Sequence, residues 1–335
     1  MSSIKDFKAI IDRIDKKQFE PIYFLEGEES YFIDKIADKL EASVLTESEK
    51  SFNFQILYGR EVQILDLIAA AKRFPMMANH QLIIVREAQY LKGIEGIIDY
   101  ISNPVPSTIL VILYKGKKVS RATKLGKSLK QKGAFTSDRM RESEVASWLE
   151  YHIKHLGLQI QPQATRLLLN SLGTSLSKLS NELDKIKVNL NGQTMITAEI
   201  VSKNTGIDRE YNVFELTKSL GQRNLEKSMR IVKYFASNPK DNPFILVLSN
   251  IFSYFKRVHM VQLTGSNNKS EVARTLGISP YFVDEYISAA QKYRPSEMHD
   301  IIRLFHEFDL RSKGLEGGSS ADSELLTELV ARIIK

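Results

Sequence analysis

The residues Glu26-Gly27-Glu28-Glu29-Ser30 follow the apolar run "IYFL" and precede a stretch with helical periodicity. Many nucleotide-binding proteins hold a phosphate at such a strand–turn–helix junction, because backbone N–H groups at the helix start attract an anion. A P-loop, G-x-x-x-x-G-K-[ST], also needs a second glycine and a lysine at fixed spacing, and neither stands at that spacing after Gly27. The carboxylates suit the positive end of an empty helix and would repel a triphosphate. The segment therefore predicts a nucleotide-binding topology without the nucleotide.

A second candidate phosphate loop is Gly126-Lys127-Ser128, but the first glycine of a P-loop would fall at 121, where the chain has Arg121. The apolar run "LIIVREA" ends in Arg86-Glu87, whereas P-loop enzymes carry an aspartate there that holds magnesium. We therefore expect no ATP hydrolysis, no catalytic residue and no bound cofactor.

Metal and thiol chemistry is equally unsupported. The chain has no cysteine, which excludes thiolate zinc sites, cysteine nucleophiles and disulfides. His152 and His155 lie one helical turn apart and could share a metal, but the sequence indicates no third ligand, and solvated helix histidines are more common. No metal site is predicted.

The chain has 335 residues, a formal net charge of +7 and a pI near 9.2, which is compatible with nucleic acid or an acidic protein as partner. A membrane-spanning helix needs about 20 apolar residues. The longest apolar runs of the chain, such as residues 108–114, are far shorter. The opening segment "MSSIKDFKAIIDRID" reads as an amphipathic helix with acidic residues, not as a signal peptide. We expect a soluble, cytoplasmic protein.

Strand and helix patterns alternate over residues 21–137. The expected strands begin at residues 22, 52, 81, 108 and 134, and the expected helices cover 28–45, 62–74, about 92–102 and 119–132. Apolar strands separated by helices favour a mostly parallel sheet covered on both faces. Residues 142–210 and 211–335 look all-helical. The predicted fold class is therefore α/β plus all-α, with domains at 1–140, 141–210 and 211–335.

Over nearly its whole length the chain resembles the delta subunit of the bacterial DNA polymerase III clamp loader. The resemblance lies in the order of "PIYFLEGEESYFIDKI", "RFPMMANHQLIIVREAQYL", "LGTSLSKLSNELDKI" and "FHEFDLRSKG" along the chain. It implies an AAA+-like domain without a P-loop, a small helical lid and a helical collar. It also implies a role in DNA replication: binding and opening the sliding clamp for loading onto primed DNA, beside ATPase subunits in a hetero-oligomer.

The resemblance places the clamp-binding element on Phe74, Pro75, Met76 and Met77. Pro75 is expected to end the helix at 62–74, whose apolar positions are Ile64, Leu65, Ile68 and Ala71. Methionine suits an adaptable apolar contact with a partner. From the sequence alone, packing of the two methionines beneath their own loop is the favoured alternative, and the resemblance reverses that preference. Met77 stands where the family usually has phenylalanine.

Two other segments have competing interpretations. Lys117, Lys118, Arg121 and Lys124 are candidates for contact with DNA phosphates or another subunit, and we favour the subunit or a solvated face over the phosphates. Residues 270–293 have the spacing of a helix-turn-helix, and a DNA-binding regulator is the alternative function. Asp284 and Glu285 at the start of the second helix would repel phosphate, so a collar hairpin is preferred.

Overall fold

The computed structural model describes residues 2–335 except 133, 191, 206–210, 279 and 316–320. The chain divides into two compact units, residues 1–140 and 141–335. A further boundary between residues 210 and 211 stays a prediction, and residues 206–210 beside it lie outside the described part of the chain.

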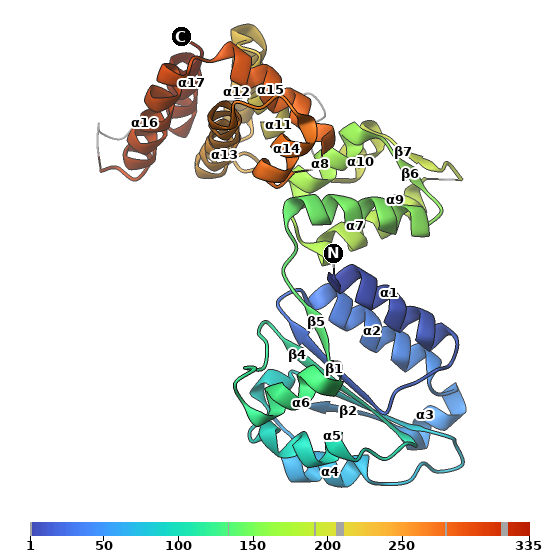
Figure 1. Cartoon of the computed structure of the whole chain (residues 1–335). Helices are drawn as coiled ribbons and strands as arrows, with labels where there is room; N and C mark the ends of the chain where they lie inside the picture. The colour runs from blue at the N-terminus through green and yellow to red at the C-terminus, as the bar shows by residue number, and fades with distance from the viewer. Residues whose placement is uncertain (1, 133, 191, 206–210, 279, 316–320) are drawn as a thin grey trace. The chain divides into compact units, whose positions relative to one another are not determined.

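A five-stranded parallel sheet forms the centre of the first unit (Figure 1). Its strands are β1 (Ile22–Gly27), β2 (Phe54–Tyr58), β3 (Gln81–Arg86), β4 (Thr108–Lys115) and β5 (Phe135–Ser137), in the order β2-β3-β4-β1-β5. The inner strands β3 and β4 are buried almost throughout, as their continuous apolar sequences predict for a sheet covered on both faces. The α/β prediction is confirmed.

Helices cover both faces of this sheet. Figure 1 shows α1 (Ser2–Asp15) and α2 (Ser30–Ser43) side by side on one face, with α4 (Ile64–Ala71), α5 (Ile98–Ser102) and α6 (Lys124–Lys132) on the other. Two short 3-10 helices, η1 (Ala88–Tyr90) and η2 (Ile94–Ile97), precede α5. Alternate strand residues such as Phe24, Ile83 and Leu110 join one apolar core with α4, α5 and α6.

Several predicted boundaries are wrong. Helix α4 ends at Ala71, before Phe74 is reached, so Pro75 lies in the following loop and does not stop the helix. Helix α6 begins at Lys124 rather than at 119, because the hydroxyl of Thr123 accepts the Gly126 N–H at 3.1 Å and caps the helix. A short helix, α3 (Glu47–Asn53), occupies residues that the sequence assigned partly to a strand.

The second unit is mainly helical. Its first part contains α7 (Glu142–His155), α8 (Pro162–Leu172), α9 (Leu176–Asn189) and α10 (Ala198–Thr205). The expectation that residues 142–210 are all-helical is wrong in one detail, since β6 (Gln159–Ile160) and β7 (Met195–Ile196) form a small parallel pair.

The rest of the second unit is helical, as predicted. It contains α11 (Val213–Gly221), α12 (Leu225–Ser237), α13 (Phe244–Thr264), α14 (Lys269–Leu276), η3 (Pro280–Phe282), α15 (Val283–Lys292), α16 (Pro295–Ser312) and α17 (Asp322–Ile334). The long helix α13 contributes Val247, Ile251 and Phe255 to the core of this part. None of the helices among the described residues is long and apolar enough to cross a membrane.

Candidate functional site

Backbone groups in the turn after β1 form hydrogen bonds with other parts of the chain. Gly27 has φ 137°, and a Cβ at this position would overlap the backbone oxygen of Ser137 on β5. The same oxygen accepts the Glu29 N–H at 3.2 Å, and the Gly27 carbonyl accepts the Gly116 N–H at 2.8 Å. Glycine is therefore needed here for close backbone packing, and these groups are already bonded to the chain.

A carboxylate of the chain occupies the anion position at the start of α2. Glu29 is the N-cap, and its side chain accepts the Tyr31 N–H at 2.9 Å. Burial raises the pKa of Glu29 above its usual value, although the hydrogen bond from Tyr31 acts in the opposite direction. A nucleotide phosphate at this helix start would have to displace Glu29.

Glu26 plays a different part from that expected of a carboxylate at the helix start. Its side chain is completely buried, forms an ion pair with Arg121, and accepts the Val119 N–H at 2.9 Å and the Thr136 hydroxyl at 3.2 Å. These bonds join the ends of β1 and β5 to the segment before α6. Arg121, predicted as a candidate DNA or subunit contact, is thus also part of the packing of the first unit.

The second candidate phosphate loop is not a loop. Gly126, Lys127 and Ser128 lie within helix α6, so their N–H groups cannot wrap around a phosphate as those of a P-loop do. A Cβ at Gly126 would overlap the Ser120 carbonyl oxygen, which gives this glycine a packing role.

We predict that the purified chain shows no saturable ATP binding in calorimetric titration with ATP and magnesium. The physical reason is that Glu29 caps α2 and that Lys127 projects from a helix rather than from a phosphate loop. Tight binding that disappears in Lys127→Ala would contradict this prediction and restore an irregular P-loop at residues 126–128.

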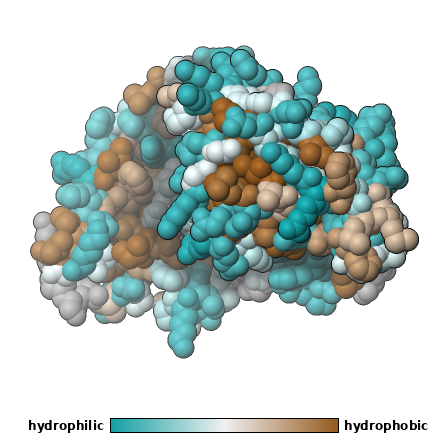
Figure 2. Space-filling model, turned by 90° about the horizontal axis from the view of Figure 1, so that it is seen from below, coloured by the Kyte–Doolittle hydropathy of each residue, from teal (hydrophilic) through white to brown (hydrophobic). Residues whose placement is uncertain are grey.

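The residues predicted for clamp binding lie on an exposed loop between α4 and β3. The relative solvent exposures of Phe74, Met76 and Met77 are 81%, 62% and 102%. The two methionines therefore do not pack beneath their own loop. Figure 2 shows apolar side chains on the surface among polar ones. Clusters of exposed large apolar groups are typical of interaction sites. Clamp binding by these residues stays a prediction.

Two other exposed apolar residues of the first unit escaped the sequence reasoning. Phe52 on α3 is 73% exposed, and Leu65, one of the apolar positions noted for α4, is 76% exposed. Helix α4 instead buries Leu67, Ala70 and Ala71. The sequence signal was weak, because apolar residues surround this short helix on all sides and periodicity alone cannot orient it.

The loop begins and ends at anchored positions. The Gln81 amide donates to the Arg73 carbonyl at 2.6 Å and to the Thr108 hydroxyl at 2.7 Å, and that hydroxyl donates to the Ala71 carbonyl at 2.8 Å. The loop precedes β3, whereas the turn at Gly27 follows β1. Since the strands of this sheet are parallel, the loop and the turn lie at opposite ends of the sheet.

The four basic candidates do not form one free patch. Lys118 pairs with Asp138 and Arg121 with Glu26, while the Lys117 ammonium lies 5.6 Å from the centre of the Tyr114 ring. Lys124 is exposed at the first residue of α6. Two of the four charges are thus already paired within the chain, and a contact with DNA or another subunit stays a prediction.

Helices α14 and α15, which carry most of the described residues of 270–293, pack against each other. Helix α15 buries Val283 and Ala289, and Glu285 pairs with Arg166 of α8 at 2.6 Å. Asp284 pairs with Lys269 at 2.7 Å. A recognition helix must offer one face to DNA bases. In α15 the first turn carries two carboxylates, both engaged by basic residues of the chain, which disfavours the DNA-binding regulator.

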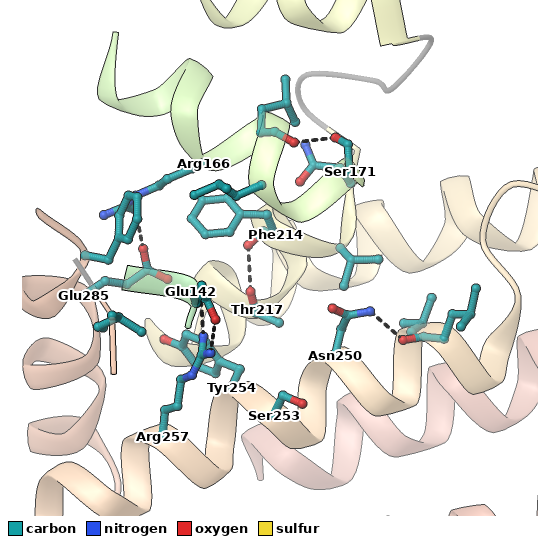
Figure 3. Close-up of a pocket in the computed structure, with 18 of the residues that line it drawn as sticks. Glu142, Arg166, Ser171, Phe214, Thr217, Asn250, Ser253, Tyr254, Arg257 and Glu285 are labelled. Carbon is teal, nitrogen blue, oxygen red and sulfur yellow. Dashed lines mark hydrogen bonds and ion pairs between the residues drawn. The ribbon is translucent and has the colours of Figure 1, made fainter. Parts of the chain in front are cut away.

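A pocket of about 330 Å³ in the second unit contains charged groups that bind one another (Figure 3). Glu142 of α7 pairs with Arg257 of α13, and Arg166 pairs with Glu285. Burial raises the pKa of Glu285 above its usual value, although Arg166 opposes the shift. We interpret these two pairs as links between helices, because each of the four charges already has its partner within the chain.

The two histidines considered for a metal have aromatic neighbours. His152 stacks on Trp148 with ring centres 5.0 Å apart, and His155 stacks on Tyr151 at 6.2 Å. Within the described ranges no group of three or more possible ligands is placed to hold a metal ion.

The parallel sheet, the occupied helix start after β1 and the helical second unit define an α/β domain without a P-loop, followed by a mainly helical unit. The sequence-family model of the DNA polymerase III delta subunit matches residues 23–137. The family model of the C-terminal domain of this subunit matches residues 210–331. The chain belongs to the DNA polymerase III delta subunit family.

Two similar proteins and one solved structure carry the name of the same subunit. The chain is 24% identical over 329 residues to the DNA polymerase III subunit delta of Bacillus subtilis, covering 94% of this chain and 93% of that protein. It is 22% identical over 227 residues to a probable delta subunit of Aquifex aeolicus, covering 64% and 63%. The solved DNA clamp loader delta protein of Bacillus subtilis has a TM-score of 0.58 at 22% identity, covering 98% of this chain and 99% of that one, and supports the fold.

Proposed function

We propose that this chain is the clamp-loader subunit that binds the sliding clamp and opens it for loading onto primed DNA during replication. The observation that carries the proposal is the loop after α4, on which Phe74, Met76 and Met77 expose most of their surface. Apolar side chains that the fold does not bury are suited to become the buried centre of an interface. The family membership supplies the kind of partner.

The chain acts in this proposal without hydrolysing ATP. Its own phosphate position is filled by Glu29, so the free energy of ATP must come from neighbouring ATPase subunits in a hetero-oligomer. Binding at residues 74–77 would take place at the opposite end of the sheet from the turn at Gly27. We also propose that Lys117 and Lys124 are the basic residues open to a subunit or to DNA, and that the complex works in the cytoplasm.

The direct test is titration of the purified full-length chain with the sliding clamp of the same organism in a calorimeter. We expect saturable binding in the absence of ATP, because the exposed loop needs no nucleotide to form. Binding should persist at raised salt, since apolar contacts are screened far less than surface charges. The proposal is wrong if the chain, shown to be folded by circular dichroism, gives no heat and no complex with the clamp.

A further inference from the structure

Asn53, the last residue of α3, is bound to the backbone of the exposed loop. Its side-chain oxygen accepts the Met76 N–H at 2.6 Å, and its side-chain nitrogen donates to the Met76 carbonyl at 2.9 Å. The same nitrogen donates to the Glu49 carbonyl at 3.1 Å. Asn53 is 5% exposed, so these bonds are largely shielded from water. One side chain therefore satisfies both backbone groups of Met76.

The next residue shows why the backbone needs to be held. Met77 has a positive φ of 54°. This is the left-handed region, which a residue with a Cβ rarely adopts. Its side chain is fully exposed, so little burial offsets this conformation. Such a backbone persists only where its surroundings determine it. The two bonds from Asn53 act on the residue directly before it.

Asn53 is itself held in place by the sheet. Asn53 is followed at once by β2, and the register pairs Phe54 with Leu82 on β3, directly after Gln81. Gln81 in turn holds the Arg73 carbonyl at the beginning of the loop. The loop is thus fixed at Arg73 by β3 and at Met76 by the residue before β2, which leaves the side chains of residues 74–77 to project.

We propose that Asn53 is a positioning residue for partner binding: it holds the loop in the conformation in which Met76 and Met77 are presented to the sliding clamp. This inference rests on the proposed function. A loop that is ordered before binding loses less conformational entropy in the complex, so the affinity is higher than that of the same side chains on a free loop. Nothing in the local sequence links residue 53 to residue 76.

The test is a double-mutant cycle on clamp affinity in the full-length chain. We expect Asn53→Ala to weaken clamp binding about tenfold, and to have little further effect when Met76 and Met77 are already alanine, because both changes act on the same contact. Asn53→Asp keeps the acceptor for the Met76 N–H but loses the donor to the Met76 carbonyl, and should also weaken binding. Asn103→Ala, at an exposed asparagine of the same unit, is the matched control.

A second measurement does not depend on the clamp. Hydrogen exchange at the Met76 amide of the free chain should become roughly tenfold faster or more in Asn53→Ala, while amides in β3 and β4 keep their protection. Wild-type affinity in both Asn53 variants, or a loss that adds fully to that of the methionine changes, would overturn the positioning role. If the wild-type chain does not bind the clamp, the proposed function fails, and unchanged exchange at Met76 would separately reject the anchor.

Discussion

Changing Met76 and Met77 together to alanine is expected to weaken binding to the sliding clamp by roughly thirtyfold or more, about 2 kcal/mol. Both side chains are largely exposed in the free chain, at 62% and 102%, and are thus available to be buried against a partner. An apolar anchor at the centre of an interface typically accounts for a free-energy loss of this size when it is truncated. Calorimetry or surface binding measures the affinity.

The stability of the chain separates a binding role from a structural one. Exposed side chains contribute little to the free energy of unfolding, so the melting temperature of the double variant should remain close to that of the wild type. Val188→Ala is the matched control, because Val188 is an exposed apolar residue of the second unit, at 79%. An unchanged clamp affinity would contradict the clamp-binding role of Met76 and Met77. A large fall in melting temperature would show that the two methionines stabilise the folded chain.

Arg121→Ala is expected to lower the free energy of unfolding of the first unit by roughly 2 kcal/mol. The change leaves the fully buried carboxylate of Glu26 without its charged partner, and removing one member of a buried pair is strongly destabilising. The Arg121 side chain is 40% exposed, and Val119 and Thr136 still donate to Glu26. We therefore expect less than the full cost of breaking a buried pair, because solvent screens part of the interaction. Urea denaturation followed by circular dichroism measures the change.

Lys127→Ala provides the control for this experiment, since Lys127 is exposed on the helix that follows. It should leave the unfolding midpoint within experimental error of the wild type. If Arg121→Ala is as stable as Lys127→Ala and instead weakens assembly with another subunit or DNA, the predicted contact role of Arg121 is the correct one. A loss of stability alone would assign Arg121 to the internal packing.

The amino-acid sequence by itself determined the five strands, their order along the chain, and the absence of a P-loop signature. Buried parallel strands are readable because they need continuous apolar residues, as residues 108–114 have. The loss of the phosphate loop is readable because that chemistry depends on a glycine and a lysine at fixed spacing. The exposed loop at residues 74–77 was located through the family resemblance, not through periodicity.

The tertiary structure alone decided which residues hold these parts in place. Asn53 meets Met76 across 23 residues, and Arg121 meets Glu26 across 95. Helix α4 ends at Ala71, where hydroxyls from Tyr100 and Thr108 donate to the Ala71 carbonyl, rather than at Pro75. Hydrogen bonds and ion pairs of this kind leave no periodic trace in the sequence, because they join residues that become neighbours only in the folded chain.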